Sequence, residues 1–568
     1  MSYYIRLILL ILIAALFACD NGNHGVAGVK VLDTLLKQYP IYVKISPKGD
    51  AILLKERSFE TFDLFISNLD NSSPIKIDSS DFTQLSLTWH PSGGEIIFQE
   101  LNPKTRKYDL CILNIETKEK SKINLPSSSN AIPPIRWSVN GKYLAYVSTN
   151  ELSRLYIFDF EEKKVVRVFA DIDSYSDFRW LDNTTIFFLS HPKNPTLYKF
   201  NVPNNHISKY SLNNYDEVKN FSVKENKLLF VGREKNEEYF QCFELKMDER
   251  LVEKLTDSDF NIEKCKYSKN TSSFYYNRNE NGVSRLYSSD WKVDSLIQNE
   301  TDKLSSFELE LELNSDLYLK QSTSGLPPSL LKVNVSNGKK KTLYLKDNIS
   351  FLKLGNPELV RISGSTNEDE IPGYLWKAKP QKKAGVKTII YVHGGPYLQF
   401  RPLWNMHAKL FTKYGFNFLA INYHGSSGYS KQFAMKNNES KQILDVVNSV
   451  LYLKEKYGLN SKDIILIGSS YGGKLVMGAI DYLEGLGGVV LISGLINQNI
   501  KNTDRLRKLR MLVFYGEYDP LALITKELLE RKNLIDLGSD NLEIFKGEGH
   551  FFHKTTSWTH IYTKIIEL

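Results

Sequence analysis

Two domains of different architecture are predicted by the sequence: a ring of repeated antiparallel sheets, followed by an α/β domain built on a mostly parallel sheet. Across residues 41–350, an anchor residue, a polar turn and an apolar β-run recur at a steady period. Across residues 351–568, apolar runs alternate with segments of helical periodicity. In this second half, the turn 468–472 has the sequence Gly-Ser-Ser-Tyr-Gly and connects an apolar run to a helical one. These observations predict a seven-bladed β-propeller followed by an α/β-hydrolase domain.

The spacing of the anchor residues predicts the propeller. Consecutive anchors lie 41 to 48 residues apart, a period typical of four-stranded blades. One blade cannot bury both of its faces alone, so neighbouring blades must cover them. We interpret the tryptophan anchors as packing between blades rather than as ligand-stacking residues, because they recur at structural spacing. A pair of β-sandwiches is the alternative, which the steady period disfavours. The seven anchors are Ile45, Trp89, Trp137, Trp180, Phe221, Tyr267 and Leu311.

Apolar runs in the second half predict the strands of a sheet that is covered on both faces. Continuous apolar runs between helices are typical of such buried, mostly parallel sheets. The expected strands are 388–392, 416–421, 463–467, 489–492, 511–515 and 542–545, and the expected helices are 440–457 and 474–480.

The serine turn between the third of these strands and the second helix is a candidate nucleophile elbow. A tight strand–turn–helix with the pattern G-x-S-x-G holds a serine hydroxyl clear of the sheet, at a helix N-terminus that favours negative charge. Ser470 has glycine two residues before and two residues after it, whereas Ser469 would need glycine where Ile467 stands. We therefore predict Ser470 as the nucleophile. The alternative is an ordinary turn rich in small residues.

A serine hydroxyl needs a base within hydrogen-bonding reach and a third group that orients the base. In this fold the chain order is serine, acid, histidine. Asp519 and His550 each follow an expected strand and are the predicted acid and base. Glu517 is the alternative acid, although it is also typical of a solvated loop. His553 and His560 fall on the expected last helix and are interpreted as surface residues.

A tetrahedral intermediate also needs hydrogen-bond donors for its oxyanion. One expected donor is the N–H of Tyr471, directly after the nucleophile. The second is expected from the segment 393–396, His-Gly-Gly-Pro, directly after the first strong strand, where glycine lets the backbone approach a substrate closely. A plain turn is the alternative for this segment.

Taken together, these motifs resemble the prolyl oligopeptidase family of serine peptidases, most of all its acylaminoacyl-peptidase and dipeptidyl-peptidase branch. The resemblance implies a triad of Ser470, Asp519 and His550, with oxyanion donors from Gly395 and Tyr471. It also implies short peptide substrates admitted past the propeller, and no metal or cofactor. The motifs that carry it are 393–396, 422–429, 470–473, 519–520 and 549–550.

Two departures from the family pattern bear on activity. His424 stands where the family usually has arginine, which weakens any inherited role for that position. The stretch 493–510 is much shorter than its counterpart, which helps to wall the substrate pocket in the family. We therefore expect a pocket that is more open or partly lost.

The N-terminus has the pattern of a targeting segment. Arg6 precedes an apolar run, 7–18, that is shorter than a membrane span and typical of a signal peptide. Residues 16–19 resemble a bacterial lipobox, with Phe17 as a departure, which implies a signal peptide over 1–19 and a lipidated Cys19. Residues 20–40 are expected to lead into the propeller. An uncleaved anchor is the alternative; both predict a membrane-tethered, extracytoplasmic protein.

Composition and charge disfavour several other classes of function. The net charge of +8 is spread along the chain, and the one dense run, 339–341, is interpreted as a solvated turn, so no nucleic-acid partner is expected. Beyond Cys19, three cysteines remain, too few for a complete disulfide framework. Free buried thiols are favoured, with a Cys242–Cys265 bridge as the alternative. The spacing of cysteines and histidines does not match a metal site.

Three hypotheses follow from the sequence. The first is a membrane-tethered serine peptidase that hydrolyses short peptides through an acyl-enzyme. The second is a carboxylesterase that uses the same triad, because a triad alone does not distinguish amides from esters. The third is a propeller binding protein whose hydrolase domain has degenerated, which the short stretch 493–510 suggests.

Overall fold

The structure is a computed structural model of the chain. It describes residues 40–57, 61–69, 73–81, 84–102, 104–105, 107–125, 131–148, 154–169, 177–190, 195–290, 304–344, 353–365, 369–378, 386–496, 505–506, 508–523 and 542–568. The predicted signal peptide 1–19 with Cys19, most of the segment 20–40 and the predicted domain boundary at 350 lie outside these residues.

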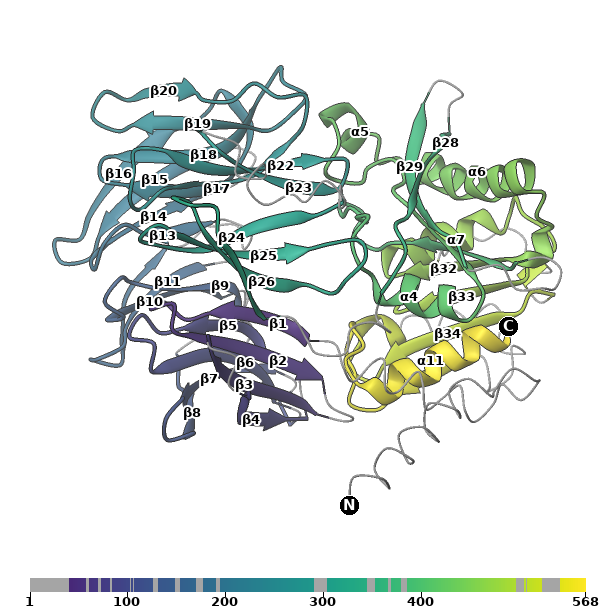
Figure 1. Cartoon of the computed structure of the whole chain (residues 1–568), viewed down its shortest axis with the longest axis horizontal. Coiled ribbons are helices and arrows are strands. Elements are labelled where there is room, and N and C mark those ends of the chain that lie inside the picture. Colours follow the sequence, from purple (N-terminus) through teal and green to yellow (C-terminus); the bar gives the residue numbers. More distant parts are fainter. Residues whose placement is uncertain are drawn as a thin grey trace.

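Seven antiparallel sheets form the N-terminal domain, and each is made of strands consecutive in sequence (Figure 1). Blades 1 and 2 are β1 (Pro40–Ile45), β2 (Ala51–Arg57), β3 (Phe62–Asn68), β4 (Ile75–Ser80), then β5 (Leu85–Trp89), β6 (Glu95–Asn102), β7 (Lys107–Asn114), β8 (Lys120–Ile123). Blades 3 and 4 are β9 (Ala131–Trp137), β10 (Tyr143–Ser148), β11 (Arg154–Asp159), β12 (Lys164–Phe169), then β13 (Phe178–Trp180), β14 (Thr185–Leu189), β15 (Thr196–Asn201), β16 (His206–Ser211).

The remaining blades complete the predicted seven-bladed propeller. Blade 5 is β17 (Tyr215–Lys224), β18 (Lys227–Glu234), β19 (Gln241–Lys246) and β20 (Leu251–Lys254). Blade 6 has three strands among the described residues: β21 (Ile262–Tyr267), β22 (Phe274–Glu280) and β23 (Val283–Ser288). Blade 7 is β24 (Ser306–Leu313), β25 (Asp316–Ser322), β26 (Ser329–Asn334) and β27 (Lys340–Tyr344).

Hydrophobic cores lie between the blades, one for each pair of neighbours. The core between the last and first blades contains Tyr318 and Leu330 of blade 7 together with Val43 and Ile52 of blade 1. Blades 1 and 7 remain separate sheets, so side-chain packing, and not a shared sheet, closes the ring.

The tryptophan anchors take part in this packing between blades. Trp89 and Trp137 are buried in the cores between blades 1 and 2 and between blades 2 and 3. Trp180 packs against the next core, and its indole N–H donates to the carbonyl of Arg136 in blade 3 at 3.1 Å. These contacts confirm the packing interpretation of the anchors. All three described cysteines are free and buried, as the sequence favoured.

An eight-stranded sheet forms the C-terminal domain, in the order β28-β29-β31-β30-β32-β33-β34-β35. Its strands from β30 onwards pair in parallel, whereas β28 and β29 form an antiparallel edge. The strands are β28 (Glu358–Ser363), β29 (Glu370–Trp376), β30 (Thr388–Val392), β31 (Asn417–Ile421), β32 (Ile464–Ser469), β33 (Gly488–Ile492), β34 (Met511–Gly516) and β35 (Leu542–Phe545).

Helices cover both faces of this sheet. The longer described helices are α4 (Met406–Lys413), α6 (Glu439–Tyr457), α7 (Tyr471–Ala479) and α11 (Thr555–Glu567). Side chains of α6 and α7 share one hydrophobic core with the sheet, and side chains of α4 and α11 share the other. The expected strands and both expected helices are present within about three residues, which confirms the α/β-hydrolase prediction.

The two domains lie side by side and contact each other at several points (Figure 1). The short helix α5 (Lys431–Met435) lies at the junction, where the Lys431 amide donates to the carbonyl of Glu238 in blade 5 at 2.8 Å. Arg401 of the α/β domain forms an ion pair with Glu263 of blade 6. The Trp404 amide donates to the carbonyl of Thr323 in blade 7 at 2.6 Å.

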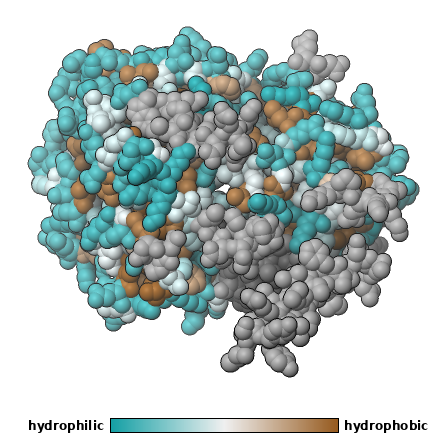
Figure 2. Space-filling view, viewed as in Figure 1, coloured by the Kyte–Doolittle hydropathy of each residue, from teal (hydrophilic) through white to brown (hydrophobic). Residues whose placement is uncertain are grey.

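The face of the molecule drawn in Figure 2 shows no large apolar area among its coloured residues. Figure 2 shows one face on which hydrophilic residues predominate and apolar ones form small separated spots. Within the described part of the chain, no helix is both long and apolar enough to cross a bilayer. The same residues hold no cluster of three or more histidine, cysteine or carboxylate side chains suited to a metal ion.

Candidate active site

Ser470 lies at the turn between β32 and α7 in a backbone conformation that is rare for serine. Its φ and ψ are 49° and −119°, as expected for the strained elbow of this fold. The turn is anchored by its neighbours: the Ser470 amide donates to the Ile492 carbonyl at 3.1 Å, and the Leu495 amide donates to the Ser470 carbonyl at 2.8 Å. The strained turn therefore places the Ser470 hydroxyl beyond the end of β32, at the start of α7.

The glycines of the elbow are required by close packing. A Cβ atom on Gly468 would lie 2.6 Å from the Cα of Gly473, and one on Gly472 would lie 2.1 Å from the carbonyl oxygen of Val392. Gly473 in turn packs against Gly494, whose Cα would be 2.7 Å from an added Cβ. No side chain fits in these spaces, so the turn can pass this close to β30 only with glycine.

The structure brings the three predicted catalytic residues together. Nε2 of His550 lies 3.0 Å from Oγ of Ser470, and Nδ1 of the same ring lies 3.0 Å from Oδ2 of Asp519. The Asp519 side chain is fully buried, whereas that of His550 is 28% exposed. Each pair is within hydrogen-bonding distance, so serine, histidine and aspartate form a continuous chain.

The environment of Asp519 keeps it ionised. Burial alone would raise the pKa of this carboxyl group. Hydrogen bonds from His550 and from the Leu521 amide, the latter at 3.0 Å, outweigh burial and hold the pKa of Asp519 below its usual value. An ionised carboxylate at this position fixes a proton on Nδ1 of His550 and leaves Nε2 as the acceptor that faces Ser470.

The loops that carry Asp519 and His550 are joined by backbone contacts. The Tyr518 amide donates to the Glu548 carbonyl at 2.9 Å. Gly516 allows this approach, because a Cβ on it would lie 2.3 Å from the carbonyl oxygen of Gly549. Glu548 is buried and accepts the amides of His553 and Lys554, both at 2.8 Å, which ends the loop where α11 begins.

The alternative residues considered from the sequence lie elsewhere. Glu517 accepts the Gly547 amide at 2.9 Å instead of facing His550. His560 lies on α11 and pairs with Glu543 at 2.6 Å with nearly half of its side chain exposed. His553 contacts the propeller, where its ring packs edge-on against Phe62 of blade 1 at 5.5 Å between centroids.

The two predicted oxyanion donors have free amides next to the nucleophile. Tyr471 is the first residue of α7, where an N–H has no partner within the helix. Among the described residues, neither its amide nor that of Gly395 makes a hydrogen bond. Sequence reasoning missed that Gly394 packs against the nucleophile: a Cβ built on it would lie 2.9 Å from the Cβ of Ser470.

A buried histidine supports the loop that contains these glycines. Nδ1 of His393 lies 2.7 Å from the Gly394 carbonyl, and Nε2 lies 3.0 Å from Oγ of Ser426. Burial lowers the pKa of His393 to about 4, so the ring is neutral near pH 7. Because a carbonyl can only accept, Nδ1 carries the proton. The ring also stacks on Tyr423, whose hydroxyl donates to the His393 carbonyl at 3.0 Å.

His424 has a structural partner. Its side chain is buried, and Nδ1 lies 2.9 Å from Oδ2 of Asp445 on α6, which also accepts the His424 amide at 2.9 Å. The His424 carbonyl accepts from Gln442, and Gln442 accepts the hydroxyl of Tyr471 at 2.7 Å. The position therefore connects α6 to the residue that follows the nucleophile.

The stretch 493–510 is described only in part. Ser493 to Ile496 continue directly from β33 beneath the elbow, and 508–510 lead into β34. Residues 497–504 and 507 lie outside the described part of the chain, so the expectation of an open or partly lost pocket stays a prediction.

The site faces the interface between the domains. Gln399 follows the Gly394–Gly395 loop, and its Oε1 accepts a hydrogen bond from Asn279 of blade 6 at 2.8 Å. His553, three residues after the triad histidine, meets blade 1. Both loops that flank Ser470 therefore touch the propeller.

Comparisons with known proteins agree with this architecture. Residues 44–303 match the TolB beta propeller domain, and residues 403–484, which include Ser470, match the prolyl oligopeptidase family. The acylamino-acid-releasing enzyme of Rattus norvegicus is 27% identical over 185 residues, which are 29% of this chain and 25% of that enzyme. Dipeptidyl peptidase family member 6 of Caenorhabditis elegans is 31% identical over 103 residues, 17% of this chain and 13% of that protein. The chain thus aligns with at most about a quarter of the length of these curated relatives.

Solved structures share the fold over nearly the whole chain. The acylaminoacyl peptidase of Pyrococcus horikoshii superposes with a TM-score of 0.66 at 17% identity, covering 94% of this chain and 96% of that one. A puromycin-hydrolyzing peptidase of Mycobacterium tuberculosis superposes with a TM-score of 0.72 at 12% identity, covering 94% of each. At such identities the likeness concerns the fold. The family matches concern the propeller over 44–303 and the part of the α/β domain, 403–484, that includes Ser470.

Proposed function

We propose that the protein is a serine peptidase that hydrolyses short peptides through an acyl-enzyme on Ser470. The observation that carries the proposal is the chain of two 3.0 Å contacts, from Oγ of Ser470 to His550 and from His550 to Asp519. A nucleophile, a base and an orienting acid in hydrogen-bonding reach are the parts that acyl transfer requires.

The geometry assigns a role to each group. Oγ of Ser470 attacks the scissile carbonyl while Nε2 of His550 accepts its proton, and the imidazolium that forms is stabilised by ionised Asp519. His550 then donates the proton to the leaving amine, which leaves an ester on Ser470. A water molecule, deprotonated by the same imidazole, hydrolyses the ester and restores the serine.

The negative charge that develops on the carbonyl oxygen is stabilised by the amides of Tyr471 and Gly395 in this proposal. Both amides lack a partner among the described residues. Tyr471 also lies at the N-terminus of α7, where the helix dipole favours an anion. Such fixed donors are worth about 10²–10³ in kcat in other serine hydrolases.

Exposed apolar residues next to these groups support a peptide substrate with apolar side chains near the scissile bond. Tyr397 and Leu398 directly follow the Gly394–Gly395 loop and are 59% and 56% exposed. Phe551 follows the triad histidine and is 71% exposed. Large apolar side chains this exposed are typical of binding sites when several gather around one centre. One of the structural neighbours carries a peptide chloromethyl ketone, Z-Gly-Gly-Phe, as its ligand.

The experiment is labelling with a fluorophosphonate probe, followed by assays of a peptide anilide and a nitrophenyl ester. We expect wild-type protein to label and to cleave the anilide, and Ser470→Ala to do neither. Ser469→Ala, one residue earlier on β32, is the matched control and should label. Cleavage of the ester alone would replace the peptidase proposal with a carboxylesterase. Absence of labelling would favour a propeller binding protein with a degenerate hydrolase domain.

We also propose that the protein is tethered to a membrane outside the cytoplasm by a lipid on Cys19. The support is the sequence alone: an apolar run of signal-peptide length followed by the lipobox-like segment 16–19. Cys19→Ser should move the protein from the membrane fraction to the soluble fraction and remove the lipid mass from its N-terminal peptide. Unchanged membrane association of this variant would point to an uncleaved anchor.

A further inference from the structure

The inner strands of the propeller carry an uneven set of charges. The first strands of successive blades are neighbours around the ring, so their alternate side chains face a common central channel. The residue before each anchor occupies an equivalent place on its strand. In blade order these residues are Lys44, Thr88, Arg136, Arg179, Asn220, Lys266 and Glu310.

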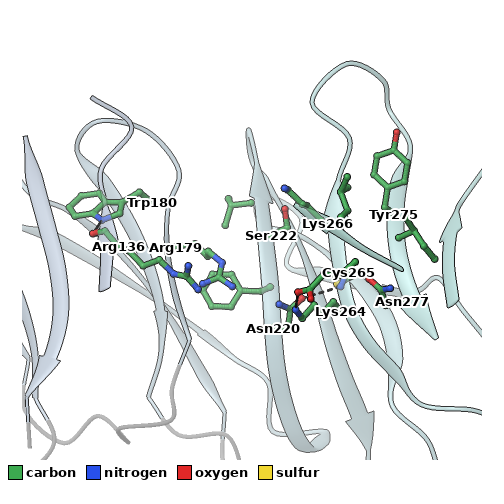
Figure 3. A pocket seen from close by; sticks show the side chains of 15 residues that line it. Arg136, Arg179, Trp180, Asn220, Ser222, Lys264, Cys265, Lys266, Tyr275 and Asn277 are labelled. Atoms are coloured by element: carbon green, nitrogen blue, oxygen red, sulfur yellow. Dashed lines mark hydrogen bonds and ion pairs between the residues drawn. The ribbon is translucent and has the colours of Figure 1, made fainter. Parts of the chain in front are cut away.

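A cavity of about 480 Å³ opens between these strands in the channel. Figure 3 shows Arg136, Arg179 and Trp180 on one side of it, with Asn220, Lys264 and Lys266 across from them. Its other lining residues include Ser222, Tyr275, Asn277 and Glu308.

Only some of the channel cations have carboxylate partners. Arg179 forms an ion pair with Asp177, and Lys264 forms one with Glu308. Arg136 approaches Asp177 only to 4.0 Å, and its buried Nε has no hydrogen-bond partner. Within the residues that the structure describes, no ion pair reaches the other two channel cations, Lys44 and Lys266.

The unpaired cations act on one another through the channel. Burial and the nearby Arg179 lower the pKa of Arg136 to about 10, and burial lowers the pKa of Lys44 and of Lys266. Glu310 acts in the opposite direction and raises the pKa of both lysines, while burial and the neighbouring Glu308 raise the pKa of its own carboxyl group. Confined charges without partners are unfavourable, and an anion in the channel would relieve this cost.

We propose that this channel is a binding site for the carboxylates of short acidic peptides. The guanidinium of Arg136 can bind a carboxylate through two parallel N–H groups, and the ammonium of Lys266 adds a second cation. The neutral side chain of Asn220 also lines the cavity, where it can contact the peptide that carries the acid.

The location of the cavity connects it with the α/β domain. A second cavity, of about 310 Å³, shares Lys264, Asn277 and Glu308 with the first and is walled by Arg401 and Leu403 of the α/β domain. An acidic peptide held in the channel therefore lies next to a cavity that extends to the α/β domain. That the bound peptide is a substrate rests on the proposed function; the binding itself does not.

The test measures binding by isothermal titration calorimetry in Ser470→Ala protein, so that no turnover can occur. The probes are a blocked tetrapeptide with two glutamates, the same peptide with glutamines, and inorganic phosphate. We expect the glutamate peptide to bind at least roughly tenfold more tightly than the other two probes, because hydrogen bonds to charged groups are the strong ones. Its affinity should fall as NaCl is raised from about 50 mM to about 500 mM.

Variants locate the site. In the Ser470→Ala protein, the further substitutions Arg136→Gln and Lys266→Gln should each weaken binding of the glutamate peptide by roughly tenfold. Lys339→Gln, which removes the same charge from an exposed turn outside the channel, should change it by less than about twofold. If Arg136→Gln does not fold, Lys266→Gln decides the matter, since it removes a charge that has no partner.

Equal affinity for the glutamate and glutamine peptides, or unchanged binding in both channel variants, would overturn the proposal. Phosphate binding as tightly as the glutamate peptide would overturn the peptide assignment and leave a general anion site. Because these measurements need no catalysis, an inactive wild-type protein that still binds the glutamate peptide would refute the proposed function and not this inference.

Discussion

Gly394 lies directly against Ser470: a Cβ atom built on the glycine would stand 2.9 Å from the Cβ of the serine and 3.1 Å from the carbonyl oxygen of Ser469. The loop after β30 thus touches the nucleophile itself, and the following residue offers the Gly395 amide. Any side chain at position 394 must push one of these two segments away.

Gly394→Ala should therefore impair catalysis while the protein stays folded. A displacement of the nucleophile by a few tenths of an ångström up to about 1 Å can cost on the order of 10² in rate, so we expect a loss of that size in kcat/KM. Steady-state kinetics on a peptide anilide, with circular dichroism to check folding, measures it. Gly355→Ala is the control, because an added Cβ there meets nothing within 4 Å. Wild-type kinetics for the position-394 variant would show that the nucleophile does not depend on this spacing.

Asp519→Asn, compared with Glu517→Gln, should show which of the two candidate acids orients His550. An amide cannot hold the Nδ1 proton of His550 as a carboxylate does, and the equivalent change in a serine protease lowers kcat about 10⁴-fold. Glu517→Gln keeps an acceptor for the Gly547 amide and lies away from the imidazole, so it should retain nearly wild-type kcat. If the loss appears in Glu517→Gln and not in Asp519→Asn, the assignment of the acid is wrong.

The sequence predicted most strands of the α/β domain because each parallel strand is a continuous apolar run between helices. It did not predict β28 and β29, for identifiable reasons. β28 is an edge strand in which buried and exposed residues alternate, and β29 contains Pro372 and Gly373, which disfavour a strand interior. Local pattern thus identifies the buried centre of a sheet better than its edge.

The triad was predictable because its order along the chain is fixed by the fold and each acid or base follows a strand. The supporting residues were not, because their roles depend on contacts between distant segments. Asn422 shows the difference: its amide group donates to the Phe400 carbonyl and accepts the Phe400 amide, which fixes the loop that leads to the propeller. No spacing in the sequence indicates that pairing. The unpaired channel cations likewise become visible only when the blades close into a ring.

His424→Ala should destabilise the protein, because it removes a partner from the fully buried carboxylate of Asp445. Two amides, of His424 and Ser365, still donate to that carboxylate, so the loss is moderate. We expect the free energy of unfolding to fall by about 1–3 kcal/mol. Urea unfolding measures it, with His560→Ala as the control, since that residue belongs to a half-exposed pair with Glu543 worth at most about 1 kcal/mol. Equal effects of the two substitutions would argue against a structural role for His424.

His407 should make stability depend on pH. Its ring is partly buried between α4 and α11, with Nδ1 at 2.8 Å from the hydroxyl of Tyr562, and desolvation lowers its pKa to about 4. In the unfolded chain a histidine has a pKa of about 6.5, so between these values the unfolded state binds the proton and the native state does not. Stability is therefore complete above about pH 6.5 and falls as the pH drops towards 4.

The corresponding variant is His407→Gln, which can still accept from Tyr562 but cannot be protonated. Between pH 7.5 and 5 the wild type should lose about 2 kcal/mol more unfolding free energy than this variant, the amount that the difference in histidine pKa supplies. Urea unfolding at the two pH values measures it. Because burial also lowers the pKa of His393 to about 4, part of the acid sensitivity should persist in His407→Gln. A variant whose stability falls as steeply as that of the wild type would show that His407 is protonated in the native state as readily as in the unfolded one.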